Sequence, residues 1–135
     1  MKPELVRYRL ERAEESLQET EVLIAAGKTK GAVNRLYYSM FYAVTALLET
    51  GDFSSSKHSC VRSLFNHHYV KTGVVSSDTG DFFNRIFEDR HKGDYMDFVV
   101  FTGEQVEENY GDCRKYITEI RAKINEIMGW SFHEK

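Results

Sequence analysis

The residues best suited to bind an anion gather in one stretch of the chain, residues 85–95. The cationic side chains of this stretch are Arg85, Arg90 and Lys92. An arginine that is fixed by a carboxylate can hold its planar guanidinium ready for a bidentate contact with a phosphate. The sequence therefore marks Arg90 as a candidate phosphate-binding residue, with Glu88 or Asp94 as the carboxylate that fixes it.

The same cations have a second interpretation. The C-terminal end of a helix carries partial negative charge, so Arg90 and Lys92 could serve only to complement the last carbonyls of a helix. Residues 57–92 hold six Lys or Arg against four Asp or Glu, although the whole chain has a net charge of −3. An anion site and an ordinary solvated surface are both consistent with this local excess.

Motifs of the common enzyme classes are absent from the sequence. It contains no phosphate-binding loop, no dinucleotide-binding glycine motif, no zinc-binding HExxH helix and no nucleophile elbow. His67 and His68 are adjacent and point about 100° apart on a helix, so with His58 they make at best a weak metal site. We expect neither a metal ion nor a cofactor.

Apolar periodicity and helix-ending residues predict five helices. An apolar residue recurs every three or four positions, and Pro, Gly, Ser or Thr stands at the expected ends. Thr102 and Gln105 have the spacing of a capping box, and Gly129 follows the last apolar stripe. The predicted helices cover residues 3–26, 30–50, 57–71, 77–93 and 102–129. With no alternating strand pattern, the fold class is an all-α, up-and-down bundle of four to five helices.

The helix expected at residues 30–50 has hardly any polar face. Such a helix must be covered on nearly all sides. In a chain this small, a second copy of the protein could supply part of the cover, so we expect a homodimer formed through this helix.

Length and composition are those of one folded domain. The chain has 135 residues with 41% hydrophobic and 13% aromatic residues, which excludes a disordered protein. We expect a single domain over residues 1–130 and a tail at residues 131–135. The sequence has no membrane-spanning run or signal peptide, so we expect no membrane association and a cytoplasmic location. Cys60 and Cys113 are expected to be buried as small hydrophobic residues.

Several spaced elements in the same order resemble the HEPN domain superfamily. They are Asn34-Arg35-Leu36-Tyr37-Tyr38 with Phe41, then Ala46-Leu47-Leu48 and Gly51, then Lys57-His58 and Phe65, and finally Arg90-x-x-Gly93-Asp94-Tyr95. The resemblance spans about residues 5–128. It is closest to the small stand-alone bacterial and archaeal members of the superfamily.

The resemblance implies a helical bundle that dimerises and that is often encoded beside a minimal nucleotidyltransferase, as a module of the toxin and antitoxin kind. Many HEPN proteins are metal-independent endoribonucleases. Their motif has an Arg, a polar residue and, a few positions later, a His, and two copies of the motif face one another across a dimer groove.

On this sequence the motif Arg corresponds to Arg90 and the polar residue to His91. Tyr95 stands five residues after Arg90, in the place of the motif His. A tyrosine phenol has an ordinary pKa near 10 and is a poor proton acceptor at neutral pH, whereas histidine suits that role. Tyr95 could instead pack as a core aromatic near Phe98 and Phe101.

Two other Arg and His pairs imitate the motif by spacing. Arg62 precedes His67 by five residues, and Arg85 precedes His91 by six. Helical steps of this length point the two side chains well apart, so neither pair is expected to meet at one phosphate.

Residues in other helices could support the site. Arg35 belongs either to a core hydrogen-bond network with its neighbours or to the same groove as Arg90. Lys57, beside His58, stands at an expected helix start, where an anion is favoured. The candidate ligand-binding residues are Arg35, Lys57, Arg85, Arg90 and Lys92, and the candidate catalytic residues are Arg90, His91 and Tyr95.

Three functions are therefore compared. The favoured one is an interaction module that binds RNA or a nucleotide, acts with a nucleotidyltransferase partner and has weak or no catalysis. The alternative is a metal-independent endoribonuclease that uses Arg90 with His91 or Tyr95. A purely structural adaptor, the third, predicts that Arg90 is tied in an intramolecular ion pair.

Overall fold

In a computed structural model, residues 1–131 are described and form five α-helices. They are α1 (Pro3–Ala25), α2 (Thr29–Thr50), α3 (His58–Phe65), α4 (Ser77–Tyr95) and α5 (Gly103–Met128). A short π-helix, η1 (Asn66–Val70), continues α3. No strand occurs in these residues, so the predicted all-α fold is confirmed. Most of the tail predicted at residues 131–135 lies outside the described residues.

The local end signals act as the sequence predicts, with one small difference at the end of α4. Thr102 and Gln105 form the capping box of α5, and Gly129 takes a left-handed conformation with φ of 69° after its last turn. At the start of α4, the side chain that caps the helix belongs to Ser76, because its Oγ accepts a hydrogen bond from the backbone N–H of Thr79. At its other end α4 continues two residues past Gly93.

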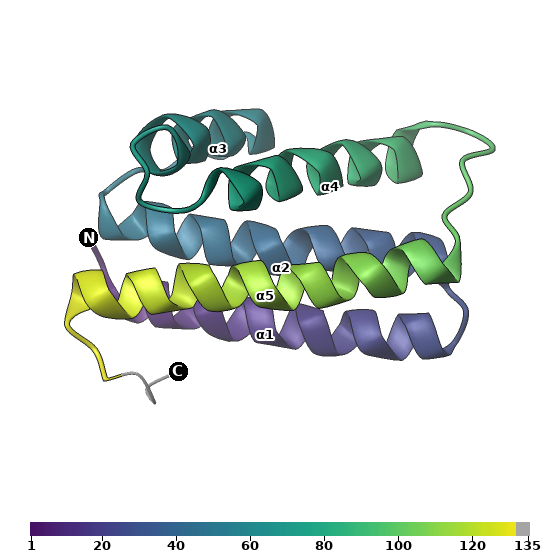
Figure 1. Cartoon of the computed structure of the whole chain (residues 1–135), viewed down its shortest axis with the longest axis horizontal. Coiled ribbons are helices and arrows are strands. Elements are labelled where there is room, and N and C mark those ends of the chain that lie inside the picture. Colours follow the sequence, from purple (N-terminus) through teal and green to yellow (C-terminus); the bar gives the residue numbers. More distant parts are fainter. Residues whose placement is uncertain (132–135) are drawn as a thin grey trace.

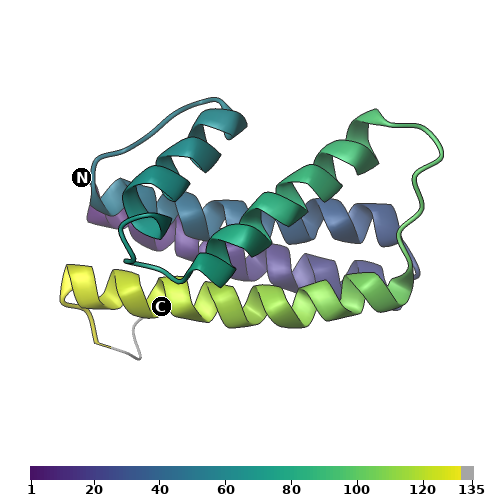
Figure 2. The same cartoon turned by 45° about the horizontal axis from the view of Figure 1, so that its top comes forward.

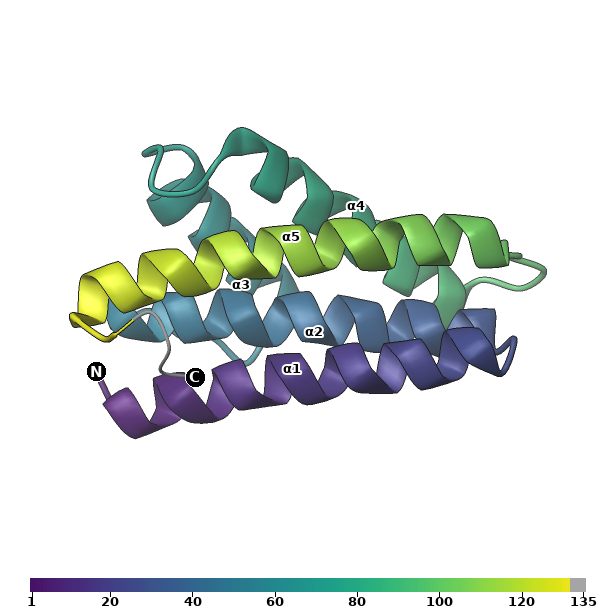
Figure 3. The same cartoon turned by 60° about the horizontal axis from the view of Figure 1, so that its bottom comes forward.

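The helices are arranged as an up-and-down bundle with α3 inserted. In Figure 1, α1, α2, α4 and α5 alternate in direction along the long axis of the molecule, so that α2 and α5 run the same way. Figure 3 shows α1, α2 and α5 side by side along this axis. The α3 and α4 helices lie obliquely across α2 and form a V in Figure 2. The two helices diverge toward the open side of this V, where α3 begins and α4 ends.

The α2 helix is the centre of the core. Twelve of its residues are buried within the single chain, including Tyr37, Met40 and Leu47, which have no exposed surface. The other residues of α2, Tyr38 and Phe41 among them, are half-buried, except for the exposed Lys30. The chain thus covers α2 itself, which removes the reason given above for placing a second copy there. The homodimer stays a prediction.

The two cysteines differ in environment. Cys113 is fully buried beside Ser39, and burial raises the pKa of its thiol to about 12. Cys60 is exposed on α3, so the expectation that both are buried is wrong for this residue. The periodicity of the short α3 helix turns Val61 and Phe65 toward the core and leaves Cys60 outside.

Aromatic contacts fix how α4 lies on α2 and α3. The Phe83 ring is stacked on that of Tyr37 with centroids 6.1 Å apart, and it meets Phe65 edge-on at 5.6 Å. All three side chains are fully buried. Because residues three or four apart share one face of a helix, this packing also turns the later residues Phe87, Arg90 and Asp94 toward α2 and α3. The packing of the core therefore orients the Arg90 side chain toward α2 and α3.

No helix within residues 1–131 is both long and apolar enough to cross a membrane.

Candidate phosphate-binding site

Arg90 is largely buried and is held by a carboxylate one helical turn away. Its side chain is 18% exposed, and its Nε lies 2.9 Å from Oδ2 of Asp94. This contact is an ion pair without the alignment of a hydrogen bond, because Nε has no acceptor in the required direction. The Nη2 atom donates a hydrogen bond to the hydroxyl of Tyr38 at 3.3 Å. Of the two carboxylates considered from the sequence, Asp94 holds Arg90, whereas Glu88 pairs with Arg62 at 3.0 Å.

Three tyrosine rings surround the Arg90 guanidinium. Its Cζ lies 5.4 Å from the ring centroid of Tyr37, 5.5 Å from that of Tyr38 and 5.9 Å from that of Tyr95. Such distances allow attraction between a cation and the faces of aromatic rings. Tyr37 is fully buried, whereas Tyr95 is 67% exposed. The tyrosines therefore place Arg90 between the core and the surface.

Arg35 is linked to the same site through Asn34. The Asn34 amide nitrogen donates to Asp94 at 3.4 Å, and its oxygen accepts two hydrogen bonds from Arg35, at 2.9 and 3.2 Å. Arg35 also forms an ion pair with Glu19 at 3.5 Å, and its guanidinium lies 4.9 Å from the ring of Tyr38. Arg35 is thus a member of a polar network that reaches Arg90 through Asn34 and Asp94. The polar network predicted for Arg35 is present, and its extension into a groove shared with Arg90 stays a prediction.

His58 reaches the site from α3. Its Nδ1 lies 3.0 Å from the hydroxyl oxygen of Tyr37, and its ring stacks on Phe41 with centroids 4.4 Å apart. The pKa of His58 is lowered from its ordinary value of 6.5, first by burial and then by the charge of Arg90. At neutral pH this imidazole is therefore uncharged. Sequence reasoning grouped His58 with Lys57 or with the other histidines and missed its proximity to Arg90.

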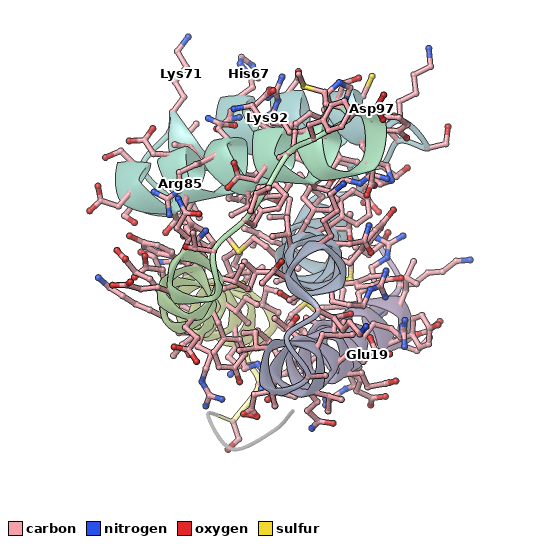
Figure 4. All side chains as sticks on the ribbon, turned by 90° about the vertical axis from the view of Figure 1, so that its right-hand side faces the viewer. Glu19, His67, Lys71, Arg85, Lys92 and Asp97 are labelled. Carbon is pink, nitrogen blue, oxygen red and sulfur yellow. The ribbon has the colours of Figure 1, made fainter. Side chains whose placement is uncertain are left out.

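Three of the candidate cations do not join Arg90. Arg85 and Lys92 occupy a different stripe of α4 and line a cavity of about 440 Å³ with Asp89, between α4, α5 and the preceding loop. Figure 4 shows Arg85 between the α4 and α5 ribbons, where its Nη2 donates to Asn109 at 3.0 Å. Lys57 is exposed just before α3. Helical phase separates Arg85 and Lys92 from Arg90 on α4, and Lys57 lies on another segment of the chain.

His91 and Tyr95 lie on a third stripe of α4. Because α4 stays helical to Tyr95, His91 is exposed and its ring contacts that of Tyr95, with centroids 5.0 Å apart. Tyr95 adjoins Arg90, but it does not pack in the core, and Phe98 is 99% exposed. The alternative that Tyr95 packs as a core aromatic near Phe98 and Phe101 is therefore wrong. The loop has turned Phe98 outward, at a φ of 62°.

In each of the two pairs that imitate the motif, the Arg and the His side chains lie apart. Arg62 lies on Phe87 at 4.2 Å and pairs with Glu88, whereas His67 is exposed in η1 against His68. Arg85 faces α5, away from the stripe that carries His91. Among residues 1–131 no group of three or more His, Cys, Asp or Glu side chains is placed to hold a metal ion.

The lowered pKa of His58 makes stability depend on pH. As the pH falls, the unfolded chain binds a proton at this histidine near pH 6.5, whereas the folded chain binds it only at a lower pH. Protonation therefore favours unfolding. His58 thus contributes stability that is present above pH 6.5 and lost as the pH falls below it. We expect the free energy of unfolding, measured by urea titration, to fall more between pH 7.5 and 5.5 in the natural protein than in His58→Gln. Equal losses in both proteins would contradict this assignment.

Comparison with known proteins identifies the family of this chain. Residues 6–127 match the HEPN domain. A protein of Thermotoga maritima named "UPF0332 protein" is 38% identical over 126 residues, which cover 93% of this chain and 96% of the relative. The Methanocaldococcus jannaschii protein named "Putative toxin MJ0142" is 35% identical over 98 residues, covering 73% of this chain and 67% of that one. The match and the all-helical fold agree with the resemblance carried by the Arg90 and Asn34 segments. The chain belongs to the HEPN domain family.

Proposed function

We propose that this HEPN chain is a module that binds RNA or a nucleotide through Arg90 and acts with a minimal nucleotidyltransferase in a system of the toxin and antitoxin kind. The proposal that the site binds a phosphate rests on how the Arg90 guanidinium is held. It is held at Nε by Asp94 and at Nη2 by Tyr38, and within residues 1–131 no hydrogen bond engages Nη1. A phosphate could bind at Nη1 while Nε and Nη2 keep the contacts that hold the side chain.

The nucleotidyltransferase partner and the toxin-like role rest on similarity. The name of the Methanocaldococcus jannaschii relative supports a toxin-like assignment. The family resemblance also implies the partner and a homodimer. In this proposal the exposed apolar residues after α4, Met96 and Phe98 among them, are available to such partners.

We propose that the site binds RNA or a nucleotide rather than catalysing a reaction through the family motif. Tyr95 occupies the place of the motif His, and His91 points along a stripe that does not contact Arg90. The motif therefore supplies an anion-binding residue beside a phenol rather than a proton-accepting imidazole.

Replacing Arg90 with alanine tests this function. We expect the affinity for a fluorescent single-stranded RNA of mixed sequence, measured by anisotropy at fixed salt, to fall by at least about tenfold. Arg90→Lys, which keeps the charge but not the planar fork, should recover only part of the affinity. Arg114→Ala, on the exposed face of α5, is the control for losing one positive charge.

The ion pair with Asp94 is also what a structural adaptor predicts, and the same variants separate the two functions. In an adaptor, Arg90→Ala lowers the melting temperature and leaves any RNA affinity equal to that of Arg114→Ala. That result would overturn the proposed function. Circular dichroism of each variant shows whether the fold is kept before affinities are compared.

A further inference from the structure

A second candidate site lies on the face of α4 that is turned toward α5. The cavity of about 440 Å³ on this face is bounded by α4, α5 and the loop before α5, and Arg85, labelled in Figure 4, lies at it. Its volume is within the range of small-molecule sites. Charged side chains of both signs line the cavity, namely Arg85, Asp89 and Lys92 from α4 and Glu108 and Asp112 from α5. Arg90 is not part of its lining.

The apolar wall of the cavity is built from side chains that are already packed in the protein. Val33 of α2 and Val106 of α5 are 5% and 1% exposed and belong to a small buried cluster beside the main core. Phe101, from the loop before α5, packs on this cluster. Gly93 makes room for it, because a Cβ at this position would lie 3.2 Å from Cε2 of the Phe101 ring. The wall is therefore a preformed surface for an apolar group.

Asp89 and Lys92 are the charged groups of α4 that this cavity leaves available to a ligand. Arg85 is engaged, because its Nη2 donates to Asn109 at 3.0 Å and lies 3.9 Å from Asp112. Within residues 1–131, by contrast, no hydrogen bond or ion pair engages the Asp89 carboxylate or the Lys92 ammonium group. Asp89 is half-buried, and burial raises the pKa of its carboxyl although the charges of Lys92 and Arg85 act in the opposite direction. A carboxylate in this state is stabilised by a donor that carries positive charge.

We propose that this cavity binds a free α-amino acid with an apolar side chain. The carboxylate of the ligand pairs with the ammonium group of Lys92, and the ammonium group of the ligand pairs with the carboxylate of Asp89. Residues three apart on a helix are neighbours, so these two protein charges can meet the two charges of one small zwitterion. The side chain of the amino acid packs on the apolar wall formed by Val33, Phe101 and Val106.

Other ligand charges fit the cavity less well. An anion meets the carboxylates of Glu108 and Asp112 beside Asp89, and a cation meets Lys92 and Arg85. An uncharged apolar molecule would cover Asp89 and Lys92 without pairing either of them, so both groups would lose water without compensation. A zwitterion pairs both groups, and this match selects the chemical class of the ligand.

Isothermal titration calorimetry of the full chain with L-leucine and with L-phenylalanine tests the proposal. We expect at least one of them to bind with a Kd of about 1 mM or lower. For each amino acid, the acid without the amino group and the amine without the carboxylate isolate the two charges. For leucine these analogues are 4-methylpentanoate and 3-methylbutylamine. Each analogue should bind at least about tenfold more weakly than its parent, and so should glycine, which lacks the apolar side chain.

Matched variants show whether the amino acid binds in this cavity. Asp89→Asn and Lys92→Met should each weaken binding by at least about tenfold, because each leaves one charge of the ligand without its partner. Asp81→Asn and Lys71→Met change exposed charges outside the cavity and should bind as the natural protein does. Circular dichroism checks that each variant is folded. Because the Lys92 side chain is exposed, Lys92→Met keeps the test decisive if Asp89→Asn does not fold.

Three results would overturn the proposal. The first is no binding of either amino acid at concentrations up to about 10 mM, well above the expected Kd. The second is an analogue with one charge that binds as tightly as its parent. The third is unchanged binding in folded Asp89→Asn or in Lys92→Met. None of these results depends on RNA binding at Arg90, because Arg90 lies outside this cavity. Failure of the proposed function would therefore leave this inference standing.

Discussion

Replacing Phe83 with alanine is expected to lower the free energy of unfolding by about 3–5 kcal/mol, the usual cost of deleting a fully buried aromatic ring. Phe83 has no exposed surface and contacts both Tyr37 and Phe65. Its removal leaves a cavity where α4 crosses α2 and α3. The measurement is urea denaturation at pH 7.5 followed by circular dichroism, with unfolding midpoints and slopes compared.

Phe98→Ala is the matched control for Phe83→Ala. Phe98 is 99% exposed in the loop after α4, so its loss should change the free energy of unfolding by less than about 0.5 kcal/mol. Similar losses in both variants would mean that Phe83 is not the contact that seats α4. Because α4 carries Arg90, Phe83→Ala should also weaken RNA binding even where the variant remains folded.

The second large effect is expected at Tyr37, where the core and the site meet. Tyr37→Ala should cost about 3–5 kcal/mol of unfolding free energy, because the ring is fully buried and packs against Phe83, Phe87 and His58. Tyr37→Phe keeps this packing and removes only the hydroxyl. It should cost about 0.5–1.5 kcal/mol, the net value of one hydrogen bond.

The contrast between these variants is measured by the same urea titrations. If Tyr37→Phe lost as much stability as Tyr37→Ala, the hydroxyl and its contact with His58 would outweigh the packing of the ring, against this account. The double variant Tyr37→Ala with Phe83→Ala should lose less than the two single losses together, since the rings contact one another. Tyr37 thus joins the stability of the bundle to the placement of His58 and Arg90.

The position of Arg90 explains why the neighbouring cations Arg85 and Lys92 cannot replace it in the site. Arg85 and Lys92 are five residues before it and two after it, but they line the cavity toward α5. Arg90 alone of these three points toward α2, where Asp94 and Tyr38 contact it. The local excess of positive charge seen in the sequence is therefore divided between two faces of α4.

Local signals in the sequence by themselves determined the helices and the family. These signals depend on residues that are close together in the sequence, so they can be recognised without the structure. They are the apolar stripes, the capping box of Thr102 and Gln105 and the glycine after α5. The apolar pattern of α2 likewise identified the helix at the centre of the core. The pairing of Arg90 with Asp94 was within reach of sequence reasoning, because residues four apart share a helical face.

Tertiary structure alone decided which of these residues share a site. The contact of His58 with Tyr37, and so its place beside Arg90, depends on how α3 and α4 cross α2. That crossing is set by rings far apart in sequence, such as Phe65 and Phe83, whose packing no periodicity reveals. The same packing leaves Cys60 and Tyr95 exposed, contrary to expectation for the first and to one alternative for the second. Helix ends follow from neighbouring residues, whereas the rotation of one helix on another follows from the whole core.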